Sequence, residues 1–474
     1  MRTDKRMLYW IFMMENGENA LGARAVDINK KLAELPVDIR LRAIDRLSIA
    51  SLRSRKTGLA RFLLVLALIG PGILVMVADN DAGGVITYAQ TGSIFGIGFF
   101  IPFMILMIPV AYVVQEMTIR LAAVTRRGHA EMIWKRYGKF WGSFSLGDLV
   151  IANSLTLVTE FIGITFGLSI FGIEPVYAVL IGFSFVLFIT MSFRYHNWER
   201  ASLVVAFFNL VFIPLVFFAK PDWAMVASSF GTWKIPLGIT PLFIYVLLAN
   251  LGTTIAPWML FFQQSSEVDK GTVPEDIKAA RRDTLVGACI MASVAISILI
   301  LTGTLVFHSG ASVTSTSSYD IQFILSTITQ KIGMLPTKLF ALGLIDAGLI
   351  AAIAITASTS WAVGEAMGWP KSINLPFLQG RKFYLPGIAS MAVAAIIVLI
   401  PHIPLGFLNL TVQVIASIFM PAAMLFLLLL VNDKEIMGAH VNSRLNNAAA
   451  ITIMCVLIAM SGLYGISLVM PGLI

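Results

Sequence analysis

Charged residues are scarce in this chain. They make up 13% of its 474 residues, whereas hydrophobic residues make up 58%. About a quarter of the residues in a soluble globular domain are usually charged, so the composition excludes a soluble globular domain. The long apolar runs have the length that transmembrane helices need, and we expect an all-α, multi-pass membrane protein embedded in the lipid bilayer.

Cysteine and histidine are scarce as well. The two cysteines, Cys289 and Cys455, lie in apolar runs, which excludes a disulfide framework and a metal-binding cysteine cluster. None of the five histidines pairs with another at metal-ligand spacing, and no nucleophile can be placed beside a base. We therefore expect neither an enzyme nor a bound cofactor.

Positive charge is in excess. The formal net charge is +8, but most Lys and Arg residues lie between hydrophobic runs, where the positive-inside rule accounts for them. Nucleic-acid binding is therefore not expected. Residues 1–58 are predicted to form a basic, partly amphipathic cytoplasmic tail held near anionic lipid. The run MLYWIFMM in this tail is too short for a signal peptide.

Transmembrane helices need about 20 mostly apolar residues, and about eleven runs qualify. Basic residues collect in the loops after the even-numbered spans, while opposite loops such as FGIEP and PHIP carry almost none. This predicts a cytoplasmic N-terminus and an extracytoplasmic C-terminus in the cell membrane, and we expect a monomer. The runs lie near 60–95, 97–122, 143–170, 174–193, 200–219, 240–264, 284–307, 338–366, 384–401, 405–431 and 448–470.

Two spans are interrupted at corresponding places. The first breaks at DNDAGG, residues 79–84, and the sixth at NLGTTIAPW, residues 250–258. A break in the first span of each of two five-span halves is typical of LeuT-type inverted-repeat transporters, which hold substrate between the half-helices. After the tail, we therefore predict a first five-helix repeat over 59–222, a second over 223–432, and a cytoplasmic loop with the eleventh helix over 433–474.

Carboxylates at the first break are the strongest functional signal. An ionised carboxylate at the bilayer centre costs at least a few kcal/mol and is retained mainly for an ion, a proton or a partner. We interpret Asp81 as functional, whereas Asp79 and Asn80 stay open between a functional and a structural role. Unwound carbonyls nearby can also ligate a cation, because irregular backbone is tolerated in a membrane where it lines a cavity.

Four segments carry a family resemblance: GPGILVMVADNDAGG (70–84), QEMTIRLAAVTRRGHAE (115–131), EFIG (160–163) and VQVIASIFMP (412–421). They are similar to the first, second, third and tenth helices of the Nramp (natural resistance-associated macrophage protein) family of divalent-metal transporters. The resemblance places Asp81 at the family's metal-binding aspartate. It implies an alternating-access carrier for a divalent cation.

The chain departs from the family at the metal ligands. After the aspartate, residues 82–84 read Ala-Gly-Gly, so the family's ligating asparagine is replaced by Gly84. In the sixth helix, Thr253 replaces an alanine whose carbonyl ligates, Ala256 replaces a methionine and Trp258 replaces a histidine.

These departures favour a hard cation. The lost methionine is a soft ligand that favours transition metals, while Mg²⁺ prefers oxygen and usually keeps several waters. The smaller side chains also leave room for a partly hydrated ion, so we expect Mg²⁺ to be transported and Mn²⁺ more weakly. The resemblance and this chemistry place the metal site among Ala78, Asn80, Asp81, Gly84, Thr253, Ala256 and Gln413.

Coupling to protons is expected to be weak or absent. In proton-coupled family members a third-helix aspartate and the sixth-helix histidine are implicated; the corresponding positions here are Leu157 and Trp258, neither of which exchanges a proton near neutral pH. Asp79, Glu160 and Trp258 remain candidate proton or supporting groups. In the sequence, no chain of titratable groups joins Glu160 or Asp346 to the metal site.

Three other functions stay open. A proton-coupled Mn²⁺ or Fe²⁺ importer would need the lost ligands to be compensated from other positions. An amino-acid transporter of related architecture would bring a carboxylate against Asp81, which repels it. An ion channel would need a continuous pore.

Residues near the span ends receive plain structural interpretations. Trp198 and Trp361 are expected to anchor the protein at the membrane interface, and Glu365 to be an interfacial carboxylate. Residues 265–283 are expected to form a solvated cytoplasmic connector with a short helix after Pro274.

Overall fold

The computed structural model describes residues 70–236, 238–307 and 320–469. Within these ranges the chain is built from helices and contains no strand, so the predicted all-α class is confirmed. The expected tail over 1–58 and the beginning of the first span lie outside the described residues.

The helices follow one another with short connections. Up to residue 229 they are α5 (Pro71–Ala78), α6 (Ala82–Phe95), α7 (Phe100–Thr125), α8 (His129–Ser169), α9 (Pro175–Ser192), α10 (Tyr195–Phe207), the 3₁₀ helix η1 (Phe208–Val211), α11 (Phe212–Ala219) and α12 (Trp223–Ser229). They continue with α13 (Pro241–Thr254), α14 (Pro257–Lys270), η2 (Pro274–Asp276), α15 (Ile277–Leu305), α16 (Ile321–Ile332), α17 (Met334–Met367), α18 (Phe377–Val398), α19 (Leu405–Asn432), α20 (Lys434–Met437), η5 (Gly438–His440) and α21 (Arg444–Val469).

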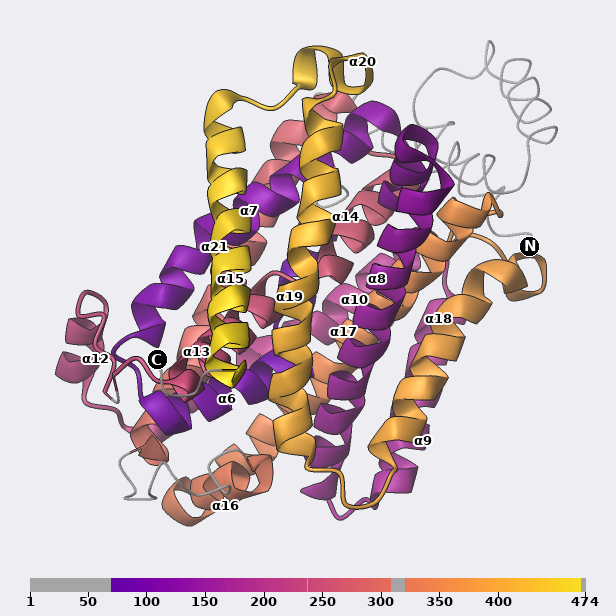
Figure 1. The fold of residues 1–474 in the computed structure, drawn as a ribbon. Helices are drawn as coiled ribbons and strands as arrows, with labels where there is room; N and C mark the ends of the chain where they lie inside the picture. The colour runs from indigo at the N-terminus through magenta and orange to yellow at the C-terminus, as the bar shows by residue number, and fades with distance from the viewer. Residues whose placement is uncertain (1–69, 237, 308–319, 470–474) are drawn as a thin grey trace, which may run out of the picture.

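Ten helical segments of the described ranges are long and apolar enough to cross a membrane. The first span adds to these, because its pieces α5 and α6 are each too short to qualify alone. The result agrees with the predicted count of about eleven. In Figure 1 the long helices run along a common direction, with α20 at one end of the bundle and α12 and α16 at the other. We name these the α20 end, which loop charge predicts to be cytoplasmic, and the α16 end.

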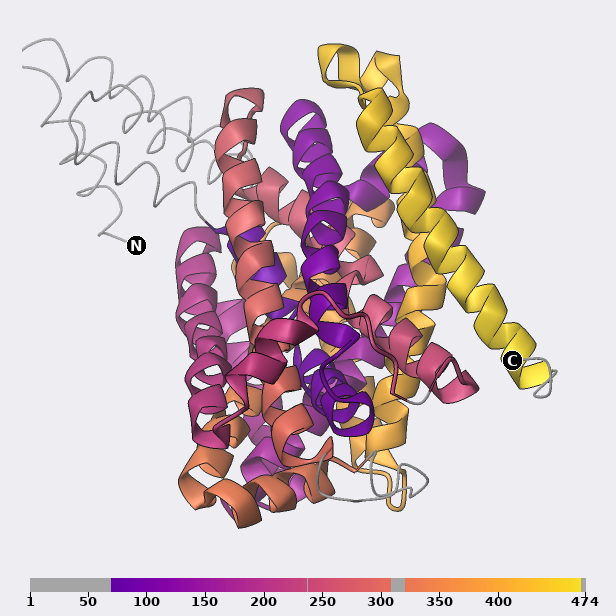
Figure 2. The same ribbon diagram turned by 90° about the vertical axis from the view of Figure 1, so that its left-hand side faces the viewer.

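Burial separates the centre of the bundle from its edge. The span that contains the second break, Pro241–Lys270, has 89% of its apolar window buried, whereas α21 has 11%. Figure 2 shows α21, in yellow, lying along one side of the bundle. The broken helices therefore occupy the protein interior, where irregular backbone can find protein partners.

Helices α8 and α17 pack along each other at the centre. Small residues permit this: a Cβ atom added to Gly348 of α17 would lie 2.8 Å from the Glu160 carbonyl oxygen, and one added to Gly167 of α8 would lie 2.8 Å from the Ala341 carbonyl oxygen. A Cβ atom added to Gly163 of α8 would lie 2.2 Å from the Ala82 Cβ of α6. Small residues let membrane helices approach closely. Together α8 and α17 form the wall against which the first break rests.

The α20 end of the sixth span is buried, which corrects the expected solvated connector over 265–283. Helix α14 continues to Lys270, and Ser266, Glu267 and Lys270 are each at most 2% exposed. The Tyr195 hydroxyl lies 2.7 Å from Ser266 Oγ. The short helix expected after Pro274 is present as η2.

Trp198 and Trp361 belong to the core and are not interfacial anchors. Their exposed fractions are 0% and 1%, and their ring centroids lie 6.0 Å apart. The Phe262 ring contacts both, at 6.1 Å from Trp198 and 5.8 Å from Trp361. Aromatic packing between three spans therefore takes the place of the predicted interfacial belt.

The third span also differs from the prediction. It begins at His129 instead of near residue 143, with a kink at Gly138, where φ is 82°. Glu365 accepts the Ala130 N–H at 3.2 Å and a hydrogen bond from Ser265 Oγ at 2.7 Å. This carboxylate is therefore a buried cap on α8, not an interfacial group.

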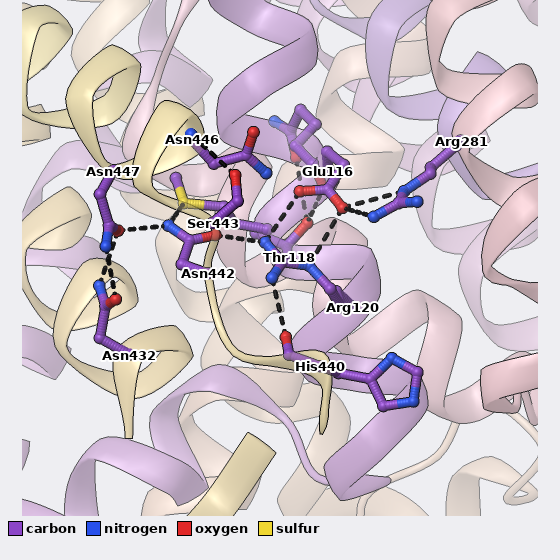
Figure 3. A network of polar contacts seen from close by, with 12 residues as sticks. Glu116, Thr118, Arg120, Arg281, Asn432, His440, Asn442, Ser443, Asn446 and Asn447 are labelled. Atoms are coloured by element: carbon purple, nitrogen blue, oxygen red, sulfur yellow. Dashed lines mark hydrogen bonds and ion pairs between the residues drawn. The ribbon is translucent and has the colours of Figure 1, made fainter. Parts of the chain in front are cut away.

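A polar network around the buried Arg120–Glu116 pair of α7 ties this helix to the segment before α21 (Figure 3). Arg120 donates to both carboxylate oxygens of Glu116 at 3.0 and 2.9 Å, to the His440 carbonyl at 2.8 Å and to Asn442 Oδ1 at 2.5 Å. Arg281 of α15 reaches Glu116 through Nε at 2.9 Å. Glu116 and Arg120 are each 4% exposed. The centre of this network therefore lies away from water, where it joins α7, α15 and the segment before α21.

Replacing Arg120 should therefore destabilise the fold. Arg120→Ala leaves a buried carboxylate with one cation fewer, and we expect a loss of about 3 kcal/mol, the lower end of the range for a broken buried pair, because Arg281 remains. The control is Arg136→Ala, since the Arg136 side chain is 44% exposed and pairs with Asp433 and Glu435; such a pair contributes about 1 kcal/mol or less. Thermal unfolding in detergent compares the two, and equal shifts in melting temperature would contradict the assignment.

Candidate functional site

The first span is broken at residues 79–81. Helix α5 ends at Ala78, and Asp81 adopts an extended conformation (φ −66°, ψ 169°) in which its carboxylate caps α6 by accepting the Gly84 N–H. Aspartate is a preferred N-cap residue, and the positive end of the helix dipole stabilises its charge. The carboxylate predicted to be functional is thus fixed by the helix that follows it.

The sixth span is broken at residues 255–256. Helix α13 ends at Thr254, and Ile255 and Ala256 are extended, with φ of −139° and −105°. Pro257 begins α14; proline has no N–H to donate and disfavours a helical conformation in the residue before it. Both interruptions predicted from the sequence are confirmed.

The two breaks lie against each other at Gly84. A Cβ atom added to Gly84 would lie 2.7 Å from Thr253 Oγ1, 3.0 Å from Asp81 Oδ1 and 3.3 Å from the Asp79 carbonyl oxygen. Thr253 Oγ1 is buried and has no hydrogen-bond partner among the described residues. Three oxygens from the two broken spans therefore surround one backbone position that carries no side chain.

Gln413 of α19 lies beside the same position. A Cβ atom on Gly83 would lie 2.2 Å from Gln413 Nε2, and one on Gly252 would lie 1.9 Å from the Gln413 carbonyl oxygen. Asn409, one turn earlier, donates to the Gly83 carbonyl at 3.1 Å. Gln413 is among the residues predicted from the sequence and Asn409 is not, although an amide inside the apolar run 405–431 is a readable signal.

Asn80 connects the first break to two other helices. Its Nδ2 donates to the Met291 carbonyl of α15 at 3.2 Å, and its own carbonyl accepts from Asn209 Nδ2 of η1 at 3.1 Å. Both carboxylate oxygens of Asp79 are buried without a partner in the described part of the chain. Ala78 is the last residue of α5, so its carbonyl belongs to the group that a helix C-terminus leaves without a following turn.

Ala256 and Trp258 make their contacts on the other side of the second break. The Ala256 N–H points to Met259 Sδ at 3.4 Å, and the Trp258 carbonyl accepts from Ser358 Oγ at 3.1 Å. The Trp258 ring packs 5.9 Å from Phe262. Trp258 is thereby part of the aromatic core around α14, while the Ala256 methyl group adds no ligand atom.

Glu160 is joined to the first break through a main-chain hydrogen bond, a link that the expected absence of a chain of titratable groups did not address. Its Oε2 accepts the Ala82 N–H at 2.9 Å, and its Oε1 accepts from Thr159 Oγ1 at 3.0 Å. The residue bonded to Glu160 thus follows Asp81 directly. No titratable pattern in the sequence could have shown this, because the partner is a main-chain amide.

The chemistry of the site follows from its donors. The described residues contain no group of three or more His, Cys, Asp or Glu side chains placed to hold a metal ion. A cation between the breaks would be held by the Asp81 carboxylate together with hydroxyl and carbonyl oxygens, a ligand set that suits hard cations. Asp81 is 2% exposed, so its carboxylate is shielded from bulk water.

At the α20 end, polar contacts hold the start of α5. Asp283 Oδ2 accepts the N–H groups of Gly70, Gly72 and Ile73 at 3.2, 2.8 and 3.2 Å. Nearby, Lys270 Nζ lies 3.1 Å from Glu199 Oε1 in a buried ion pair. Helix α5 is therefore pinned to α15 at the end farthest from the break.

Comparison with known proteins gives one consistent family. The family profile described as natural resistance-associated macrophage protein-like matches residues 72–467. The divalent metal cation transporter MntH of Granulibacter bethesdensis is 23% identical over 426 residues, 85% of this chain and 90% of that protein. The natural resistance-associated macrophage protein 2 homolog of Dictyostelium discoideum is 28% identical over 391 residues, 79% of this chain and 59% of that protein.

Solved structures agree with the fold. The manganese transporter of Eremococcus coleocola superposes with a TM-score of 0.70 at 21% identity, covering 86% of this chain and 87% of that one. MhsT in complex with L-phenylalanine gives a TM-score of 0.54 at 15% identity, covering 83% and 98%. The predicted LeuT-type architecture with broken first and sixth spans is confirmed.

The close approach at Gly252 gives a test of the site's packing. Gly252→Ala would drive a methyl group into the Gln413 carbonyl, and because backbone on α19 cannot move aside, we expect a loss of about 1–3 kcal/mol together with weaker metal binding. The control is Gly462→Ala in α21, where an added Cβ meets nothing within 4 Å. Thermal unfolding with and without divalent metal measures both effects; wild-type behaviour of Gly252→Ala would show that the two helices do not pack as described.

Proposed function

The chain belongs to the natural resistance-associated macrophage protein-like family, and we propose that it carries divalent metal cations across the membrane by alternating access, with Mg²⁺ preferred over Mn²⁺. The observation that carries this proposal is the pair of facing breaks at Gly84. There, Asp81, Thr253 and the Asp79 carbonyl present oxygen atoms from both half-helix pairs. A cation bound at this point touches both repeats, which is where a carrier of this fold holds its substrate.

The preference for Mg²⁺ rests on what is absent from the site. Gly84 and Ala256 stand where the resemblance predicts an asparagine and a methionine, so an amide and a soft thioether are replaced by hydrogen and methyl. Mg²⁺ prefers oxygen ligands, whereas a thioether would favour transition metals. The room expected beside Gly84 is occupied in this closed state by Thr253 Oγ1 and Asp81 Oδ1, which lie 2.7 and 3.0 Å from a Cβ atom built there. The uncommitted Thr253 hydroxyl can accept a hydrogen bond from a water on the ion.

Alternating access is supported by the closed state of the site. Asp81 is 2% exposed, and α5 is an eight-residue half-helix held by Asp283 at the α20 end. Release of α5 would open a path from that end to the break without unfolding α6. Rocking of one element against a fixed site is the motion this architecture uses.

Weak or absent proton coupling is supported by the surroundings of the site. Leu157 is fully buried and apolar, and Trp258 lies in the aromatic core. Glu160 is held by the Ala82 N–H and the Thr159 hydroxyl, a structural duty that stabilises the break. The ion gradient and the membrane potential, about 2.3 kcal/mol per charge per 100 mV, would then drive the ion alone.

A second candidate is a proton-coupled Mn²⁺ importer. It is favoured by the names of the relatives, which include MntH divalent metal cation transporters and a structurally similar manganese transporter. Those names describe the relatives, and the two candidates differ in measurable ways: the preferred ion and the movement of protons.

Asp81→Asn should reduce Mg²⁺ uptake by at least about tenfold, because it removes the anionic ligand while keeping a side chain that can cap α6. The matched control is Asp222→Asn, since Asp222 also caps a helix, accepting the Ala224 and Met225 N–H groups at 2.9 and 3.3 Å, but is exposed outside the site. Proteoliposomes with entrapped Mg²⁺ and pH indicators record uptake and luminal pH together. Wild-type uptake by Asp81→Asn would refute the site, and acidification in step with influx would favour the coupled importer.

Restoring the family's ligands should change the selectivity. In Gly84→Asn/Ala256→Met we expect the ratio of Mn²⁺ to Mg²⁺ uptake to rise by about tenfold or more, because an amide and a soft sulfur return to the site. The Cβ atom added at residue 84 would lie 2.7 Å from Thr253 Oγ1, so this hydroxyl has to rotate away in the variant. Gly84→Ala/Ala256→Leu serves as control: it also fills space but adds no ligand, and should impair both ions alike. An equal change of the ratio in both variants would show that cavity size alone sets the selectivity.

A further inference from the structure

A cavity of about 650 Å³ opens at the α16 end and shares no residue with the two breaks. Three helix ends line it: the end of α11 with the residue after it, the last residue of α15, and the last two residues of α16. Ala219 and Leu305, which both line the cavity, are the last residues of two apolar spans. The cavity therefore lies at the level where these spans leave the hydrocarbon of the bilayer.

Two lysines give this cavity its charge. Lys220 and Lys331 are exposed, and no acidic residue is among the described residues that line it. Asp222 lines a separate cavity and accepts the Ala224 N–H of α12 at 2.9 Å. The positive-inside rule disfavours lysine at the end that loop charge predicts to be extracytoplasmic. Two lysines at one cavity there need a reason other than topology.

Lys220 stands in a backbone conformation that suits glycine. It follows the last residue of α11 in the left-handed region, with φ of 49° and ψ of 56°, and its N–H donates to the Phe217 carbonyl at 3.4 Å. Glycine is the usual residue at such a helix end, because it has no Cβ atom to collide with the backbone. A lysine in this position indicates that its ammonium group contributes something that glycine cannot.

We propose that this cavity binds the headgroup of an anionic phospholipid, with phosphatidylglycerol as the test lipid. The ammonium groups of Lys220 and Lys331 hold the phosphodiester. The acyl chains lie along Phe217 and Phe218 at the end of the fifth span, whose side chains are 64% and 43% exposed. The bound lipid joins the ends of the fifth and seventh spans to α16, which lies across the end of the bundle (Figure 1). This inference is independent of the proposed metal transport.

The charges around the cavity match one phosphodiester. Helices α11 and α16 both end there, and a helix C-terminus carries about half a negative charge. The two ammonium groups therefore leave about one net positive charge, which a singly charged phosphodiester neutralises. The carbonyls in the last turn of a helix lack a following turn, so they can accept hydrogen bonds from the glycerol hydroxyls of phosphatidylglycerol. Phosphatidylcholine has neither these hydroxyls nor a net charge.

The lining favours a lipid over a soluble anion. A free phosphate ion would contact only the two exposed ammonium groups, and salt screens exposed charges beyond about 8 Å at physiological ionic strength. The remaining lining is mostly apolar, with Leu305 and Ile332 beside the two phenylalanines. Acyl chains gain contact with this surface, whereas an inorganic ion does not. Headgroup and chains together use both parts of the cavity.

The experiment measures lipid binding to the full-length protein in detergent by native mass spectrometry, with phosphatidylglycerol and phosphatidylcholine of equal chain length. We expect the wild type to bind phosphatidylglycerol about tenfold more tightly, because two lysines attract its net charge. Lys220→Gln/Lys331→Gln should lose this preference, and Lys331→Gln alone should reduce it. The matched control is Lys338→Gln, since Lys338 is exposed on α17 but does not line the cavity. Thermal unfolding checks the fold of each variant.

The outcomes decide between a lipid and other occupants. An unchanged preference in the folded double variant, or equal binding of both lipids by the wild type, would overturn the site. Displacement of phosphatidylglycerol by inorganic phosphate would assign the lysines to a soluble anion and also overturn it. Loss of the preference in the double variant, with the preference retained in Lys338→Gln and in Asp81→Asn, would support it. Uptake of Mg²⁺ by Asp81→Asn tests only the divalent-metal site, so the two proposals can fail separately.

Discussion

A backbone N–H or C=O that leaves its helix inside a bilayer has to find its partner in protein, because no water is present to serve. The break at residues 79–81 meets this constraint with side chains from three other helices. Asn209 of η1 donates to the Asn80 carbonyl in the break itself, while at the start of α6 Glu160 of α8 accepts the Ala82 N–H and Asn409 of α19 donates to the Gly83 carbonyl. The same bonds that make the break tolerable also fix where these helices stand, so the site and the fold share one set of interactions.

This constraint explains why glycine is so frequent at the site. Gly83, Gly84 and Gly252 each face a polar atom of a neighbouring segment at a distance where a Cβ atom would collide. The backbone at these glycines therefore lines the site, and the proposed ligands are oxygen atoms that lie close to this backbone. Replacing a ligating side chain with hydrogen at residue 84 is compatible with this packing, because the neighbouring Thr253 hydroxyl and Asp81 carboxylate occupy the adjacent space. The selectivity that we propose thus has its origin in packing as well as in ligand chemistry.

The fold could be predicted from the sequence because membrane helices and their breaks leave local signals. The apolar runs predicted the spans, and Asp81 and Pro257 indicated where two of them are interrupted. Both signals are local, because helix capping and proline act on the nearest residues. The sequence could not reveal how buried polar groups pair across helices. Glu365, Trp198 and residues 265–270 sit near span ends, where a polar or amphipathic residue is normally exposed, and tertiary contacts from α8, α14 and α17 bury them instead. Likewise, the link from Glu160 to the break runs through a main-chain amide, which no residue pattern encodes.

The closed state has to be stable yet reversible if α5 is to move. Three N–H groups at the start of α5 converge on one carboxylate oxygen of Asp283. Hydrogen bonds to a charged group contribute about 1.5–3 kcal/mol each in net terms, and bonds that share one acceptor oxygen contribute less than their sum. When α5 swings out, water can replace them at both donor and acceptor, so the difference between closed and open states stays within the few kcal/mol that a bound ion can shift. The Arg120 network, by contrast, ties α7 to α15 and to the segment before α21 through the buried charges of Glu116 and Arg120, which lose partners if these segments separate. Under the proposed alternating access, the bonds that water can replace thus lie on the half-helix α5, and the bonds that it cannot replace lie in the Arg120 network.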